Sequence, residues 1–365
     1  MATYFGIDAA DVLLKWVQGQ PEQQALVAVD ELLVEGSSAH TQASYCAALR
    51  YWAAWYQLRF GEPIALPVSV STVLQFVVDH ARRSAPSGTL VWELPADIDQ
   101  TLVQGGFKGK RGPMAISTLT HRVAVLSWAH QRSPTLQNPC HDPKVRELLR
   151  KTRRAYALRG ERARGKPALT CVALEALLAT CDKSLRGLRD RALLLVGFCS
   201  GGRRRSELAA LQVEALRQVG TDAFVFELRA HKADGDGRTR PEDMKPVVGQ
   251  AARALSAWLA AAGLESGPVF RRVYRSGRTG PGLSAESVRD IVMTRTRLAG
   301  LDAAYSAHSL RSGFLTEAGL QGVPLGETMA LSSHRSLSVA MGYYRVGEVT
   351  HTRAARILEN HESER

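Results

Sequence analysis

The chain has few lysines, no long apolar run and no basic leader. It holds 9 Lys against 38 Arg. No stretch approaches the roughly 18 consecutive apolar residues of a membrane span, so none is expected. The first residues, MATYFGIDAADVLLKW, lack the basic start and the cleavage site of a secretory signal. We therefore expect a cytoplasmic protein.

Cysteines are scarce and unpaired in their spacing. The five form no CxxC pair and their number is odd, which excludes a disulfide framework or a zinc knuckle. We expect free thiols in a reducing compartment and no metal site. They are Cys46, Cys140, Cys171, Cys181 and Cys199.

The positive charge is large and uneven. The formal net charge is +12, yet residues 1–36 hold six acidic residues and one Lys. Residues 144–166 hold ten basic residues and only two acidic ones. Arginine's planar fork suits bidentate contacts with phosphate, so this stretch predicts a polyanion partner.

Composition and periodicity divide the chain into four parts. Residues 1–36 form an acidic extension of unknown role, and 37–158 form an all-helical basic domain. Residues 159–167 (RGERARGKP) have the Gly, Pro and charge of a linker. Residues 168–365 form a second domain that we expect to be mainly helical, with one small antiparallel sheet. The predicted fold class is therefore mainly α in two domains.

In the first domain an amphipathic stripe marks a helix. Tyr45, Leu49, Trp52 and Tyr56 recur at helical spacing and are expected in the core. Residues 84–112 are loop-rich and end in GGFKGKRG, which departs from the Walker spacing and lacks its Ser or Thr. We interpret this end as a flexible basic loop that contacts DNA.

In the second domain two segments predict a pair of strands. Residues 223–230 (AFVFELRA) alternate, with Phe224, Phe226 and Leu228 on one face, and residues 245–249 form the returning strand. The DGDG turn lies between them. Helices are expected at 250–263, 284–299, 309–320 and 324–331.

The second domain also carries groups suited to phosphate chemistry. Attack on a phosphodiester builds negative charge on the non-bridging oxygens and, without a metal, Arg, Lys and His donors must meet it. In GGRRRSELAAL only one arginine of three can point into a given pocket. Glu207 lies one helical turn after Arg204 and can orient it, so Arg204 is preferred, although Arg203 stays possible.

Further positions along the chain add basic groups to this candidate site. Lys232 precedes the hairpin turn, and Lys245 on the returning strand is a weaker candidate. His308 and Arg311 lie one helical turn apart and share a face. His334 follows 23 residues after Arg311.

A phenol lies nine residues beyond His334. It is Tyr343 in MGYYR, and the adjacent Tyr344 is the alternative.

This ordered set resembles the motif of the phage-integrase family of tyrosine recombinases. The R-R-S-E-L segment, hairpin Lys, H-x-x-R, second His and Tyr match in order and spacing. Residues 37–158 are similar to that family's helical core-binding domain, and the resemblance covers roughly residues 37–350. One departure is Ser333, which stands where the family usually has Gly before the second histidine.

The resemblance implies a metal- and ATP-independent reaction with no cofactor. Tyr343 would attack the scissile phosphate and form a 3′-phosphotyrosine, while Arg204 and Arg311 clamp the non-bridging oxygens. Lys232 would protonate the leaving 5′ oxygen. His308 would assist proton transfer from the tyrosine, His334 would hydrogen-bond the phosphate, and Glu207 would support Arg204.

The resemblance also implies partners and a setting. The family acts as a homotetramer on two paired double-stranded DNA sites, sometimes with accessory recombination proteins, and the tail 350–365 would dock on a neighbouring protomer. We expect a nucleoid-associated enzyme, serving integration, excision or transposition of a mobile element. Two alternatives are a DNA-binding protein without the chemistry and a DNA-relaxing enzyme. Candidate DNA-binding residues are Lys108, Lys110, Arg111, Arg122, Arg150, Lys151, Arg153 and Arg154.

Overall fold

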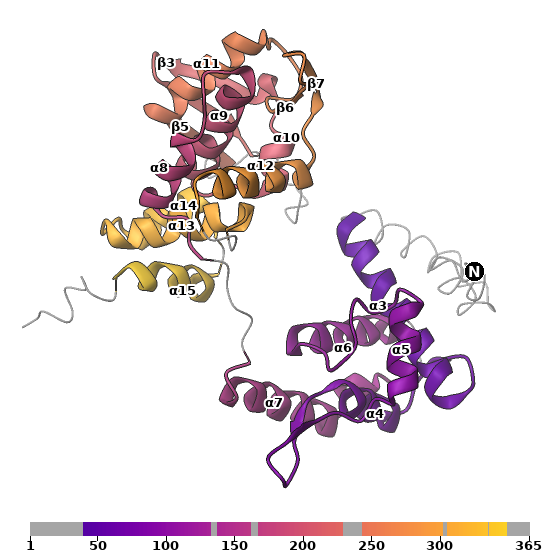
Figure 1. Ribbon diagram of the computed structural model, residues 1–365. Coiled ribbons are helices and arrows are strands. Elements are labelled where there is room, and N and C mark those ends of the chain that lie inside the picture. Colours follow the sequence, from indigo (N-terminus) through magenta and orange to yellow (C-terminus); the bar gives the residue numbers. More distant parts are fainter. Residues whose placement is uncertain are drawn as a thin grey trace, which may run out of the picture. The chain divides into compact units, whose positions relative to one another are not determined.

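The protein forms two compact units, residues 1–163 and 164–365, each with its own core. The computed structural model describes residues 39–132, 137–161, 167–228, 243–301, 305–334 and 336–348. Figure 1 shows that helices make up most of both units, with short strands between them. A mainly helical fold with small antiparallel sheets is therefore confirmed. No helix in these ranges is long and apolar enough to cross a membrane.

The first unit is built from five helices within its described residues. Helix α3 contains the predicted amphipathic stripe from Tyr45 to Tyr56, whereas α5 lies in a stretch expected to be loop. The elements are α3 (Ala39–Phe60), α4 (Val70–His80), β1 (Arg83–Ser84), β2 (Leu90–Val91), α5 (Ala96–Gln104), α6 (Ile116–Gln131), the 3-10 turn η1 (Pro139–His141) and α7 (Pro143–Leu158).

Aromatic rings hold the centre of the first unit. Trp52 on α3 stacks on Phe76 on α4, with ring centroids 3.7 Å apart, and Trp55 meets the same ring edge-on at 5.0 Å. His80 lies among them and is fully buried. Its Nδ1 is 2.7 Å from the Phe76 carbonyl oxygen, and its Nε2 is 2.7 Å from the Tyr51 hydroxyl. Burial lowers the pKa of His80 to about 3, so this core uses a neutral imidazole.

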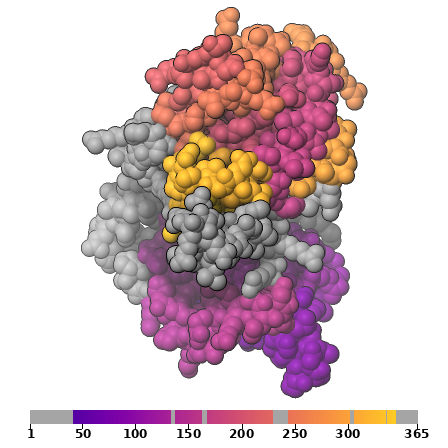
Figure 2. Space-filling model, turned by 90° about the vertical axis from the view of Figure 1, so that its left-hand side faces the viewer, coloured from indigo at the N-terminus to yellow at the C-terminus, as the bar shows by residue number. Residues whose placement is uncertain are grey.

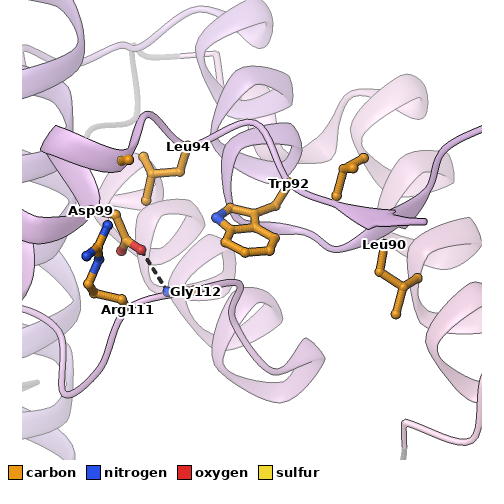
Figure 3. A pocket seen from close by; sticks show the side chains of 8 residues that line it. Leu90, Trp92, Leu94, Asp99, Arg111 and Gly112 are labelled. Carbon is orange, nitrogen blue, oxygen red and sulfur yellow. Dashed lines mark hydrogen bonds between the residues drawn. The ribbon is translucent and has the colours of Figure 1, made fainter.

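The 84–112 stretch is more ordered than its composition predicts. It contains the β1–β2 hairpin and α5, and its GGFKGKRG end folds over the buried carboxylate of Asp99. Asp99 accepts a hydrogen bond from the Gly112 amide at 2.7 Å and pairs with the Lys108 ammonium, which also donates to the Gly112 carbonyl oxygen. Figure 3 shows Asp99 beside Gly112 and Arg111, in a pocket that Trp92 also lines. These contacts with Asp99 hold the end of the loop against the first unit, and we call residues 105–112 the pinned loop.

The second unit packs helices around one buried helix, α9. Its residues Ala192–Phe198 are nearly all buried because neighbouring elements cover most of its sides, and α11 makes the most extensive contact. The elements are α8 (Cys171–Ala179), α9 (Leu185–Cys199), α10 (Arg205–Ala210), the 3-10 turn η2 (Val213–Ala215), β3 (Leu216–Gly220), β4 (Ala223–Glu227), β5 (Met244–Val248), α11 (Gln250–Ala262), β6 (Arg271–Val273), β7 (Thr279–Gly282), α12 (Ala285–Leu298), α13 (Ala307–Leu320), α14 (Leu325–Ser332) and α15 (Leu337–Glu348).

The sheet of the second unit has three antiparallel strands in the order β3-β4-β5. Phe224 pairs with Val247 and Phe226 with Lys245, as the predicted hairpin requires. Strand β3 and the separate β6–β7 hairpin were not predicted. Figures 1 and 2 show the three-stranded sheet and α11 toward one end of this unit and helices α13 and α14 toward the other.

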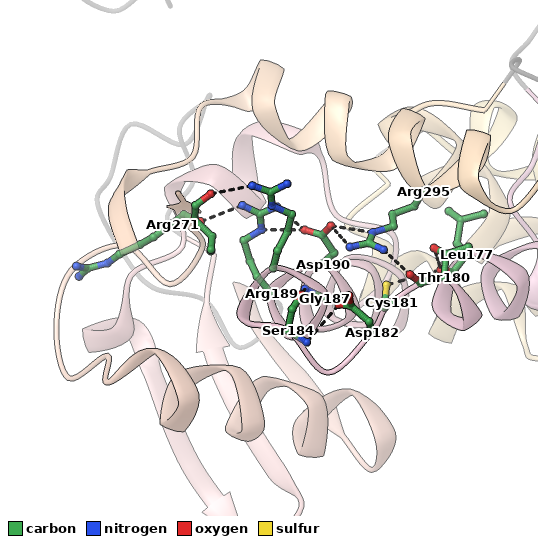
Figure 4. A network of polar contacts seen from close by, with 12 residues as sticks. Leu177, Thr180, Cys181, Asp182, Ser184, Gly187, Arg189, Asp190, Arg271 and Arg295 are labelled. Carbon is green, nitrogen blue, oxygen red and sulfur yellow. Dashed lines mark hydrogen bonds and ion pairs between the residues drawn. The ribbon is translucent and has the colours of Figure 1, made fainter. Parts of the chain in front are cut away.

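A buried charge network joins α9 to α12. Asp190, which is 4% exposed, pairs with Arg189 at 2.6 Å and with Arg295 at 2.7 Å. Arg295 also donates to the Thr180 carbonyl oxygen, and Arg189 to that of Arg271. Figure 4 shows the two guanidinium groups on either side of the Asp190 carboxylate. The network ties α9, α12 and β6 together by charge as well as by apolar packing.

Candidate active site

The turn between α9 and α10 brings three consecutive arginines to three different places. Gly201 and Gly202 have φ of 101° and 69°, which only glycine adopts readily. A Cβ on Gly202 would lie 2.6 Å from the Cα of Arg311, so this turn can touch α13 only without side chains. The tight approach sets where each arginine points.

The three arginines have different partners. Arg203 points inward, is 1% exposed, and donates to the Leu331 carbonyl oxygen at 2.6 Å. Arg205 lies on the surface and pairs with Glu286 on α12 at 2.9 Å.

Arg204 is exposed, and Glu207 on α10 holds its guanidinium in place. Its side chain is 57% exposed, and its Nη1 donates to Glu207 Oε1 at 2.6 Å. The other oxygen of Glu207 accepts the Arg204 backbone N–H at 2.9 Å and caps α10. The expectation that Glu207 holds Arg204 is therefore matched by the geometry.

Helix α13 presents His308 and Arg311 on the side of this turn. Arg311 is 5% exposed and donates from Nη1 to the Gly202 carbonyl oxygen at 3.0 Å. Both residues line a pocket of about 470 Å³ with the three arginines of the α10 start and with Arg289 of α12. The pocket wall is rich in guanidinium groups, which suits an anion.

The two candidate tyrosines are neighbours on α15 but have different surroundings. The Tyr343 hydroxyl lies 3.2 Å from His308 Nε2 and is only partly buried. Tyr344 is 7% exposed, packs against α13, and donates its hydroxyl to the Val323 carbonyl oxygen. A Cβ on Gly319 would lie 2.3 Å from the Tyr344 carbonyl oxygen, so α13 and α15 are in close contact here. This geometry favours Tyr343 as the reactive phenol and gives Tyr344 a packing role.

His334 enters the same cluster from the end of α14. Ser333 adopts φ 56° and ψ 40°, the left-handed conformation that ends a helix and that Gly adopts most readily. The chain then turns so that His334 Nδ1 lies 2.8 Å from the Ser332 hydroxyl and 3.2 Å from Arg311 Nη2.

The electrostatics of the cluster keep the arginines charged and the histidines neutral. Burial lowers the pKa of Arg203 and of Arg311 to about 10, which still leaves both cationic at pH 7. Burial and then Arg311 and Arg204 lower the pKa of His308, and burial with the same arginines lowers that of His334 to about 4. A neutral His308 can accept the proton of Tyr343.

Two lysine candidates stand differently. Lys232 lies outside the described residues. Lys245, the weaker candidate, is 1% exposed and donates to the Ala330 carbonyl oxygen at 2.8 Å. Its ammonium is therefore engaged within the protein. Among the residues with a described position, no group of His, Cys, Asp and Glu could hold a metal ion.

Two of the predicted DNA-binding residues are placed inside the first unit. The Lys108 side chain is only 8% exposed and is paired with Asp99. The Arg122 guanidinium lies 3.3 Å from the centre of the Tyr51 ring, and burial lowers its pKa. Each side chain is thus engaged by a partner within the first unit that sequence spacing does not reveal. The other six, Lys110, Arg111, Arg150, Lys151, Arg153 and Arg154, are exposed.

Comparison with known proteins identifies the family. The model of the phage integrase family matches residues 168–348. The chain is 30% identical over 303 residues to the integrase/recombinase xerD homolog of Selenomonas ruminantium, covering 81% of this chain and 79% of that protein.

Solved structures share the fold at low identity. The Tn1549 transposon integrase, in complex with transposon right end DNA, has a TM-score of 0.55 and 12% identity over 88% of this chain and 93% of its own. XerH site-specific recombinase, in a post-cleavage complex with a palindromic difH substrate, has a TM-score of 0.54 and 14% identity over 87% and 79%. The family itself follows from the 30% identical relative and the family match. The chain belongs to the phage integrase family and is a tyrosine recombinase, an enzyme that breaks and rejoins DNA strands.

Proposed function

We propose that this protein is a site-specific DNA recombinase that cleaves through a 3′-phosphotyrosine at Tyr343, and that it integrates, excises or transposes a mobile element. The observation that carries the chemistry is the 3.2 Å approach of the Tyr343 hydroxyl to His308 Nε2, beside the pocket that Arg204 and Arg311 line. A phenol next to a neutral base and a set of guanidinium groups suits attack on a phosphodiester.

The first chemical step transfers the phosphoryl group from DNA to the protein. The Tyr343 oxygen forms a bond to phosphorus, the bond from phosphorus to the 5′ oxygen breaks, and its electron pair leaves with that oxygen. His308 takes the phenolic proton, and Lys232 gives a proton to the 5′ oxygen. The 5′ hydroxyl of a second strand can reverse the sequence, which rejoins DNA without another energy source.

The arginines stabilise the charge that this step develops. Arg204 and Arg311 bind the two non-bridging oxygens, and His334 donates a third hydrogen bond from Nε2. Arg311 is held by the Gly202 carbonyl oxygen and Arg204 by Glu207, so neither must reorganise during the reaction. Such preorganised donors contribute on the order of 10²–10³ in rate each.

We infer that the first unit is the core-binding domain and that double-stranded DNA is the partner. Helix α7 displays Arg150, Arg153 and Arg154 on its exposed side, and Lys110 and Arg111 are exposed on the pinned loop. The solved relatives are recorded with DNA, which supports this partner. We further propose a homotetramer on two paired sites, with the tail 350–365 contacting a neighbouring protomer.

A nicked substrate tests the chemistry directly. DNA carrying a nick just beyond the scissile phosphate loses a short fragment on cleavage, so the covalent protein–DNA adduct accumulates and appears on a denaturing gel. Wild-type protein and Tyr344→Phe should form the adduct, whereas Tyr343→Phe should not. An adduct from Tyr343→Phe would overturn the assignment. Candidate sites come from the DNA flanking the gene.

A further inference from the structure

His334 directly follows the C-terminal end of α14, so the position of this helix end determines where the His334 side chain lies. A helix end leaves its last carbonyl groups without partners in the helix and carries partial negative charge. In α14 the Met329 carbonyl oxygen accepts the backbone N–H of Ser333 and, at 3.3 Å, that of His334. The next two carbonyl groups, of Ala330 and Leu331, need partners from elsewhere.

Two buried cations supply those partners from distant parts of the chain. Lys245 Nζ, on strand β5, donates to the Ala330 carbonyl oxygen at 2.8 Å. Arg203 Nη2, from the turn before α10, donates to the Leu331 carbonyl oxygen at 2.6 Å. Both side chains are 1% exposed. The negative end of one short helix is thus held between two positive charges.

Burying these charges is costly unless the contacts they make have a use. Arg203 Nε and Nη1 have no hydrogen-bond partner among the described residues, although Nη1 lies 3.7 Å from Glu207 Oε2. Burial of Arg203 therefore leaves part of its hydrogen-bonding capacity unused, which is a cost to stability. Its shortest contacts are with the Leu331 and Gly201 carbonyl oxygens, both of which lie at the join between the α10 turn and α14.

The same join holds the catalytic groups. A Cβ on Gly201 would lie 2.3 Å from the Leu331 carbonyl oxygen, so the turn and the helix end touch through backbone. The Gly202 carbonyl oxygen orients Arg311, and Arg311 Nη2 lies 3.2 Å from His334 Nδ1. Moving the end of α14 would move His334 relative to Arg311.

We propose that Arg203 and Lys245 are positioning residues that clamp the C-terminal end of α14 and so place His334 against the scissile phosphate. Neither residue touches the phosphate itself. This inference rests on the proposed cleavage chemistry and deepens it. It gives the three consecutive arginines separate tasks, with Arg203 inside the fold and Arg204 on the DNA.

The first test measures single-turnover adduct formation on the nicked substrate with DNA saturating. Arg203→Met and Lys245→Met should each slow adduct formation by about 10- to 100-fold, because small displacements of a catalytic group are costly in rate. Arg203→Lys should recover most of the rate, since an ammonium can still donate to the Leu331 carbonyl oxygen. Arg253→Leu is the matched control, because Arg253 lies on α11 and its exposed guanidinium pairs with Asp222.

A double-mutant cycle separates positioning from a direct or a merely structural effect. If Arg203 acts through His334, Arg203→Met should cost little further rate in a His334→Ala background. An undiminished cost in that background would overturn the proposal, because Arg203 would then act on the phosphate or on the whole fold. A rate of adduct formation unchanged in both Met variants would overturn it as well.

Stability measurements keep these outcomes distinct. Each variant is melted alone, and a loss of rate that merely tracks the loss of folded protein at the assay temperature would contradict positioning. Should Arg203→Met fail to fold, Lys245→Met takes its place in the cycle with His334→Ala. Absence of any adduct from wild-type protein would instead count against the proposed cleavage chemistry itself.

Discussion

Helix α7 of the first unit and the buried charge contacts of the second use arginine in opposite ways. On α7 of the first unit, Arg150, Arg153 and Arg154 are exposed, and the structure gives them few partners. In the second unit, Arg203, Arg311 and Arg295 are nearly buried and each is held by carbonyl or carboxylate oxygens. Exposed arginines offer many interchangeable contacts to a polyanion, whereas buried ones offer a single geometry. We therefore expect the exposed arginines to contribute to DNA affinity and the buried ones to the geometry of the proposed reaction.

The cores differ in the same sense. The first unit centres on aromatic rings and neutral imidazoles, such as His80 and His130, and its buried Lys108–Asp99 pair lies under a loop. The second buries ion pairs around Asp190 and cations around α14. Breaking a charge contact in the second unit should therefore have larger consequences than removing charge from the surface of the first.

The largest effect is expected at Arg311. Arg311→Ala should slow adduct formation by at least about 10²–10³-fold, because a preorganised donor to the phosphate is lost. Arg150→Ala, an exposed arginine of the first unit, should leave the rate at saturating DNA within about twofold. Single-turnover kinetics on the nicked substrate measure both. Equal losses of rate in Arg311→Ala and Arg150→Ala would show that buried and exposed arginines do not differ in their role.

Next comes the buried network at Asp190. Asp190→Asn leaves Arg189 and Arg295 without their countercharge and should lower the free energy of unfolding by about 3–5 kcal/mol. The matched change Asp222→Asn, in an exposed pair with Arg253, should cost about 0–1 kcal/mol. Chemical denaturation measures both. A small loss at Asp190 would mean that solvent reaches the network.

The first unit should respond to pH through His80. Its pKa is about 3 in the folded chain against 6.5 in the unfolded one, so between these values the unfolded state binds more protons. Stability should therefore fall as pH drops below 6.5, by about 2 kcal/mol from this residue at pH 5. Denaturation at several pH values, followed by tryptophan fluorescence, measures the slope. In His80→Asn, the slope due to this residue should disappear.

A smaller effect is expected from surface charge on α7. Replacing Arg150, Arg153 and Arg154 with Ala should weaken DNA binding by about tenfold and lower the slope of log affinity against log salt by about 2 to 3. Fluorescence anisotropy titrations between 50 and about 200 mM salt give the slope. A slope that does not change would show that α7 does not face DNA.

The smallest effect is expected at Ser333. Its left-handed conformation strains an L side chain, so Ser333→Gly should raise the free energy of unfolding by about 0.5–1 kcal/mol. Ser333→Val should lower it instead, because a branched side chain tolerates this conformation poorly. Thermal melting ranks the three proteins. The opposite ranking would mean that the end of α14 differs in solution.

Local patterns predicted much of the secondary structure. The stripe of Tyr45, Leu49, Trp52 and Tyr56 marked α3, and alternation at 223–230 marked β4 within three residues of its end. The spacing of His308 and Arg311 placed both toward one pocket, because residues one turn apart share a helix face. Glu207 was matched to Arg204 by the same rule.

Patterns failed where a distant partner decides the outcome. Helix α5 lies in a stretch that looked like loop, and its Asp99 is the residue that captures Lys108. Strand β3 lacks an alternating apolar face and exists because β4 offers hydrogen bonds along its edge. Lys245 was the weaker candidate for the catalytic lysine, yet its side chain is buried and donates to the Ala330 carbonyl oxygen of α14.

The sequence by itself determined the family motif, the helical class and the order of the catalytic groups, because these follow from spacing within single elements. Only the tertiary structure decided which of the three consecutive arginines is buried, which tyrosine lies beside His308, and which lysines are internal. Those choices depend on close backbone approaches at Gly201, Gly202 and Gly319. Residues far apart in the chain meet there, and no local pattern records the contact.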